Sequence, residues 1–141
     1  MKKQKPKNQK KKDPSFATII SMEVYPFEVM LSVNQDNEQL GAELGKYRKL
    51  TNEDIMACAH PSEFVQGRAV MFSNNTSIIR LRKLPTTSKD YGILAHEIFH
   101  IVTFVLDRVG MSLDINTSDE AYAYLTGYLT EKIYDAMNKY Y

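Results

Sequence analysis

The stretch DYGILAHEIFHIVTFVLDRVG, from Asp90 to Gly110, constrains the fold more than any other part of the chain. At about 100° per residue along a helix, its apolar residues fill one continuous arc, so we predict a single helix whose apolar arc faces the core. Asp90 or Ser88 can accept hydrogen bonds from the free N–H groups of the first turn, and Gly110 can adopt the left-handed conformation that ends a helix. The arc comprises Ile101, Leu94, Val105, Ile98, Val109, Val102, Ala95, Leu106 and Phe99.

Two histidines and a glutamate lie outside this arc. His96 and His100 are four residues apart, which places both imidazoles on one face of a helix. Such a pair can bind one zinc ion, while the intervening Glu97 points at the water on that ion. The alternative is an amphipathic helix with two unrelated histidines on its solvated face. The apolar flanks Ile93 and Phe104 favour the zinc site, because solvated faces usually carry Lys and Glu.

A catalytic zinc ion normally has three protein ligands, so the two histidines leave one position to be filled. The nearest candidate is Glu120, in the first turn of a predicted last helix, and Cys58 lies far upstream. The segment from Thr117 to Glu120 also matches a helix capping box, in which Glu120 would only bond the Thr117 amide. One turn later, Tyr124 is a candidate hydrogen-bond donor to an oxyanion, or else a packing residue.

Length and composition predict one domain without a membrane-spanning segment. The chain has 141 residues, enough for a single core, and no stretch approaches the length of a membrane span. Its first residues contain no apolar run typical of a secretory signal. The single Cys58 excludes an intrachain disulfide and fits a reducing compartment. We therefore expect a cytoplasmic protein with no membrane partner.

The N-terminal tail is strongly basic. Seven of the 18 Lys and Arg residues lie in the first twelve positions. We expect residues 1–13 to be a disordered tail, because they are too charged to fold, and residues 14–141 to form the domain. The segment Lys2–Lys12 allows weak contacts with nucleic-acid phosphates, although a simple solubilising role explains it equally well.

The remaining patterns predict an α+β fold, with a small antiparallel or mixed sheet packed on the histidine-bearing helix and on the helix that follows it. The alternating apolar residues of 27–33 predict a half-buried strand, and Asn74-Asn75 is a plausible tight turn of a hairpin. The segment 16–25 is ambiguous between strand and helix. The predicted hairpin strands are 68–73 and 76–84. Asn34 to Asn37 supply turn and cap chemistry for a predicted helix through about Tyr47, and two further helices are predicted from Thr51 to His60-Pro61 and from Ser118 to about Lys139.

The predicted hairpin leads directly into the histidine-bearing helix and brings a strand edge near the histidines. An extended peptide can pair with such an edge through backbone hydrogen bonds. Arg80 and Arg82 alternate along the second hairpin strand, which is commonly the sign of a solvated strand face.

The segments HEIFH and SDEAYAYLTGYL together resemble the gluzincin metallopeptidases, in which the two histidines of HExxH and a glutamate of the following helix hold zinc. The short hairpin-then-helix arrangement is similar to the smallest, single-domain members, called minigluzincins. The stretch from Tyr25 to Tyr134 also resembles small uncharacterised metallopeptidases encoded by bacteriophages. These resemblances imply a minimal zincin-like fold, a Zn²⁺ cofactor held by His96, His100 and Glu120, and, for a phage protein, the host cytoplasm.

The predicted function is therefore a zinc-dependent metallopeptidase that acts on a peptide or protein substrate. Glu97 would serve as general base toward the metal-activated water, and Tyr124 would assist the oxyanion. The alternative is a catalytically inactive module, zinc-stabilised or metal-free, that binds protein or nucleic acid.

Overall fold

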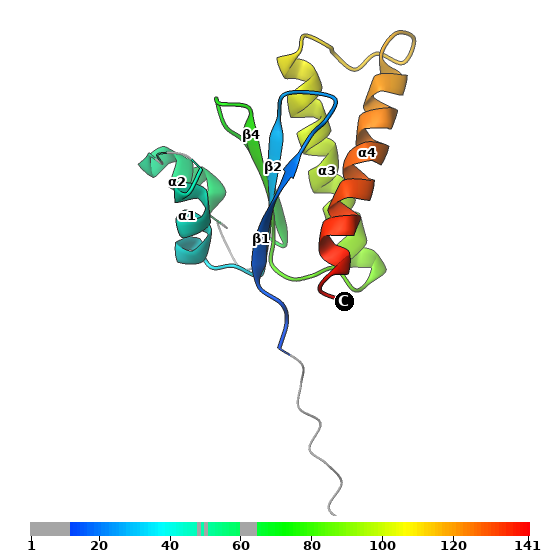
Figure 1. The fold of residues 1–141 in the computed structure, drawn as a ribbon. Helices are drawn as coiled ribbons and strands as arrows, with labels where there is room; N and C mark the ends of the chain where they lie inside the picture. The colour runs from blue at the N-terminus through cyan, green and yellow to red at the C-terminus, as the bar shows by residue number, and fades with distance from the viewer. Residues whose placement is uncertain (1–11, 48, 50, 60–64) are drawn as a thin grey trace, which may run out of the picture.

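The computed structural model describes residues 12–47, 49, 51–59 and 65–141. Within these ranges the chain forms a small α+β fold with a four-stranded sheet and four helices (Figure 1). The predicted fold class is confirmed at this level. The elements in chain order are β1 (Phe16–Ser21), β2 (Glu28–Val33), α1 (Asn37–Gly45), α2 (Asn52–Cys58), β3 (Gly67–Met71), β4 (Thr76–Leu81), α3 (Ser88–Arg108) and α4 (Asp119–Asn138).

The sheet is mixed, with the strand order β1-β2-β4-β3. Two antiparallel pairs, β1 with β2 and β3 with β4, are joined by the parallel pairing of β2 with β4. The predicted β3–β4 hairpin is confirmed, and Asn75 occupies its turn with a positive φ of 62°. The ambiguous segment that begins at Phe16 is a strand, because its β-branched residues pair with β2.

Helices cover both faces of the sheet. Figure 1 shows α1 and α2 on one side and α3 and α4 on the other. Along β2, Val29 and Leu31 belong to the larger core beneath α3 and α4, whereas Met30 belongs to a second core beneath α1. The prediction of a half-buried strand is therefore wrong, because both faces of β2 are covered. Arg80 is also buried rather than solvated, and only 3% of it is exposed.

The helix α3 begins and ends close to the predicted positions. Its N-cap is Thr87, whose side chain accepts from the Asp90 N–H, while the Asp90 side chain accepts from the Thr87 N–H in a capping box. Gly110, with a φ of 82°, follows its end, as predicted. Most of the apolar arc is buried, whereas Phe99 at its border and Val109 at the C-cap of the helix are each 44% exposed.

The helix α4 packs against α3 as an antiparallel partner (Figure 1). Its buried stripe joins the larger core, and the ring of Tyr134 stacks on that of Tyr91 in α3. No helix in the described ranges combines the length and the apolar character needed to cross a bilayer. Residues 1–11 of the predicted tail and the predicted stop at His60-Pro61 lie outside the described residues.

Candidate metal and catalytic site

His96 and His100 meet on the outer side of α3. Their Nε2 atoms are 3.0 Å apart, and their rings form an edge-to-face pair with centroids 4.6 Å apart. The ring of His100 also lies nearly parallel to that of Phe104, with the centroids 6.1 Å apart. Two nitrogen ligands at about 2.0–2.1 Å from one tetrahedral zinc ion lie about 3.3–3.4 Å from each other. The histidine pair therefore has nearly the spacing that two zinc ligands need.

Glu97 lies on the flank of α3 that faces β3. It is only 7% exposed, and its carboxylate accepts a hydrogen bond from the backbone N–H of Ala69. Burial raises the pKa of Glu97, although His96, His100 and the Ala69 hydrogen bond partly oppose this shift. A buried carboxylate beside two imidazoles, with its pKa raised, has the properties of a general base.

Gly67, at the start of β3, allows Glu97 to approach the strand. A Cβ atom at this position would lie 2.8 Å from Cγ2 of Ile93, 3.0 Å from Cγ of Glu97 and 3.1 Å from its Oε1. These distances are shorter than ordinary van der Waals contacts, so a side chain here would displace its neighbours. In the sequence, Gly67 is only a glycine directly before a predicted strand, so its contact with Glu97 is not predictable from the sequence.

An open groove runs between the start of β3 and the exposed side of α3. Because β3 stands at the end of the strand order, its outer edge is not paired within the described sheet. The groove therefore combines a strand edge that no described strand pairs with, an apolar wall and two of the predicted site residues. It is lined by Val65, Gln66, Gly67, Lys89, Gly92, Ile93, His96 and Glu97.

The structure does not bring Glu120 to the histidines. Among the described residues, no three His, Cys, Asp or Glu side chains are arranged to hold a metal ion. Glu120 is exposed in the first turn of α4, and within the described ranges it has no hydrogen-bond or ion-pair partner. The predicted alternative, a capping box with Thr117, is also not formed: the N-cap is Ser118, without a side-chain cap bond, and the Thr117 N–H donates to Asp114.

The other candidates lie apart from the histidine pair or are solvated. Tyr124 is 77% exposed on α4, so it is not a packing residue. Cys58 is buried in the core beneath α1, on the opposite face of the sheet from α3. The structure therefore assembles three of the five predicted site residues, His96, Glu97 and His100.

No family model, no curated protein and no solved structure matches this chain.

Proposed function

We propose that the protein is a zinc-dependent metallopeptidase of the gluzincin type, with a minimal zincin-like domain. One observation carries the proposal: the Nε2 atoms of His96 and His100 are 3.0 Å apart beside the buried carboxylate of Glu97. Two histidines four residues apart on an exposed helix face, with a glutamate between them, are typical of a zinc hydrolase.

The roles follow from the positions of the side chains. His96 and His100 would hold the metal, and a bound zinc ion would supply an acidified water and polarise the peptide carbonyl. Glu97 would accept the proton of that water and deliver it to the leaving amine. The backbone N–H of Ala69 would help to orient the carboxylate of Glu97.

The free edge of β3 suits a substrate in an extended conformation. A peptide that pairs with this edge would run along the groove beside His96 and Glu97. Backbone hydrogen bonds would then provide affinity, and the apolar wall at Ile93 would contact alternate side chains of the peptide.

Glu120 is the third ligand in this proposal, and Tyr124 is the oxyanion donor. Both lie on α4, so the start of α4 has to move toward the histidines when metal binds. Glu120 itself has no partner among the described residues, but Ser118 and Tyr122 bond the start of α4 to residues 111–114, so this connection has to rearrange as well. Replacing Glu120 by Ala should then weaken zinc binding, whereas replacing the exposed neighbour Asp119 by Ala should not.

The decisive experiment compares metal content and proteolysis in purified protein. We expect about one zinc ion per chain and cleavage of an unfolded protein such as casein. Glu97→Gln should keep the zinc and abolish cleavage, because the amide cannot accept the proton. Glu131→Gln, an exposed change on α4, serves as the matched control and should retain both properties. A wild-type protein without zinc would contradict the proposal.

A non-catalytic binding module is the second candidate, and the absence of a three-residue metal group in the described chain favours it. Under this alternative, Glu97→Gln changes no measurable activity. If the basic tail binds nucleic acid, deletion of residues 1–12 should reduce both the affinity and its salt dependence.

A further inference from the structure

The strand β1 forms one edge of the described sheet, at the other end of the strand order from β3. Its sequence, FATIIS, contains no charged residue, proline or glycine, and it pairs with β2 residue by residue without a bulge. Exposed edge strands are normally protected from further pairing by charges, proline, bulges or very short length. Because β1 has none of these protections, it is suited to pair with another strand.

The second half of α4 lies along β1 and runs in the opposite direction. At the start of β1, the ring of Phe16 stacks on that of Tyr140, with the centroids 3.6 Å apart. Beyond the end of β1, the N–H of Glu23 donates to the hydroxyl of Tyr128 at 3.0 Å. Between these two contacts, an open groove borders β1, lined by residues 18–21 of the strand and by one side of α4.

The helix wall of this groove carries charges of both signs, from Lys132, Asp135 and Lys139. The Nζ atom of Lys132 lies 5.5 Å from the centroid of the Tyr128 ring. Within the described ranges, no ion pair or hydrogen bond engages the side chain of Asp135 or Lys139. A partner that fits this groove should therefore also present charges of both signs.

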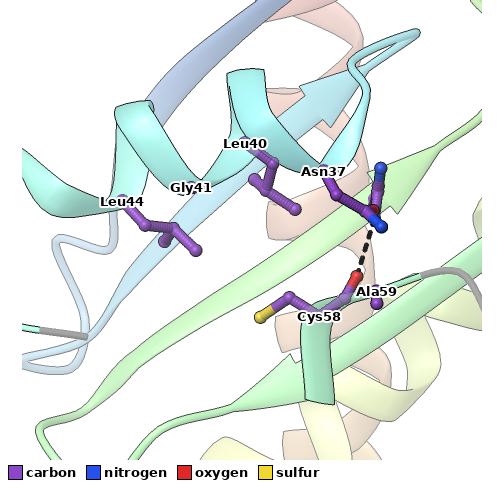
Figure 2. A pocket seen from close by; sticks show the side chains of 7 residues that line it. Asn37, Leu40, Gly41, Leu44, Cys58 and Ala59 are labelled. Carbon is purple, nitrogen blue, oxygen red and sulfur yellow. Dashed lines mark hydrogen bonds between the residues drawn. The ribbon is translucent and has the colours of Figure 1, made fainter. Parts of the chain in front are cut away.

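The opposite face of β1 borders the core beneath α1. Figure 2 shows part of this core, where Leu40 and Leu44 of α1 and Cys58 of α2 surround a small cavity. Ala17 and Ile19 of β1 pack against the same core and are only half-buried. A strand added at the edge of β1 would cover these two side chains further, because cross-strand neighbours in a sheet contact each other.

We propose that β1 pairs with β1 of a second copy of this chain, antiparallel, around a two-fold axis perpendicular to the sheet. Such a dimer is closed, because both copies use the same surface. The axis keeps α4 of both copies on the same face of the combined sheet, so the two helices lie side by side and antiparallel. The edge of β1 gains backbone hydrogen bonds, and Ala17 and Ile19 gain apolar neighbours.

The charges of α4 complement one another in this dimer. Lys132 and Asp135 lie on either side of the middle of the contact between α4 and β1, so the axis brings Lys132 of each copy opposite Asp135 of the other. Lys139 comes near the Tyr128 ring of the second copy, a favourable cation–π arrangement. An acidic peptide at the same edge would instead face the like charge of Asp135, so a second copy fits the groove better.

The test is sedimentation equilibrium of the full chain from about 1 µM to about 1 mM, a range that covers modest affinities. We expect a reversible change from the chain mass of 16.2 kDa to twice that mass. Lys132→Glu should weaken dimerisation about tenfold, because two exposed ion pairs become like-charge contacts. Asp135→Lys should have a similar effect. The double variant Lys132→Glu/Asp135→Lys should restore the wild-type affinity, because the pairs form again with reversed signs.

Lys89→Glu is the matched control, because it changes the net charge equally at an exposed position of α3 beside β3. This variant should dimerise like the wild type. Hydrogen–deuterium exchange of the β1 amides should slow as the dimer forms.

Four results would each overturn the proposal: a wild-type chain that stays monomeric over the whole range, a Lys132→Glu chain that dimerises as well as the wild type, a double variant without restored affinity, or a dimer whose β1 amides exchange as fast as those of the monomer. The interface uses the second half of α4, whereas the proposed metal site would use its start, so the two proposals are tested independently.

Discussion

Replacing Gly67 by Ala tests whether the contact between β3 and Glu97 is as tight as the structure indicates. The new methyl group would lie 2.8 Å from Cγ2 of Ile93 and 3.0 Å from Cγ of Glu97. Ordinary carbon–carbon contacts are about 3.5–4.0 Å, so both side chains must shift by roughly half an ångström or more. Glu97 has little room to do so, because it is 7% exposed and held by Ala69.

We expect Gly67→Ala to lower the free energy of unfolding by about 1–3 kcal/mol, the usual cost of overpacking a filled site. If Glu97 is the general base, the same displacement should reduce peptidase activity by up to about 100-fold, since an error of about 1 Å in a catalytic group can cost that much. Zinc binding should persist, because the atoms nearest to a Cβ at position 67 belong to Ile93 and Glu97 and not to His96 or His100.

Urea denaturation followed by circular dichroism measures the change in stability. The matched control is Gly127→Ala, an exposed helical position where a Cβ meets no atom within 4 Å. This change should instead raise the free energy of unfolding by about 0.5–1 kcal/mol, because alanine restricts the unfolded chain and favours the helix. A Gly67→Ala protein as stable as the wild type would refute the argument for a tight contact.

Two further predictions concern stability. Asp90 accepts hydrogen bonds from the N–H groups of Thr86 and Thr87 and pairs with Lys83 at 3.0 Å, and these contacts outweigh the effect of burial and hold its pKa well below the usual range. Asp90→Asn should therefore lower the free energy of unfolding by about 1 kcal/mol at neutral pH. This loss of stability relative to the wild type should shrink as the pH falls below the unfolded pKa of about 3.9. A loss that does not depend on pH in acid denaturation would contradict this prediction. Ile133→Ala should cost about 2–5 kcal/mol in urea denaturation, because Ile133 is fully buried. Tyr124→Ala, at a position 77% exposed, should stay within about 0.5 kcal/mol of the wild type, and equal losses for the two variants would contradict the assigned burial.

The local elements of the fold could be predicted from the sequence because each has a local cause. The apolar arc of α3, the glycine that follows its end and the Asn75 turn each depend on residues close together in the sequence. The burial of both sheet faces could not be predicted, because it depends on where α1 and α2 pack. The alternation around Met30 and Arg80 is typical of a strand with one solvated face. Only the tertiary structure shows that α1 and α2 cover the face that the pattern predicts to be solvated.

Part of the candidate site could likewise be predicted from the sequence, and part could not. His96, Glu97 and His100 could be placed together from helical spacing alone, since they belong to one helix. The position of Glu120 depends on the path of the connection between α3 and α4, which a sequence does not specify. The contact of Glu97 with Gly67 and Ala69 joins two elements, and no pattern within either segment encodes it.

The parallel pairing of β2 with β4 has a consequence for how the chain acquires its structure. The hydroxyl of Ser77 donates to the carbonyl of Glu28, 49 positions away, whereas both antiparallel hairpins close over short turns. Contacts between neighbours in sequence form faster than distant ones, so each hairpin should appear before the two halves join. On the ribosome, the centre of the sheet stays open until β4 has emerged, and during that interval the inner edge of the first hairpin is exposed to other chains.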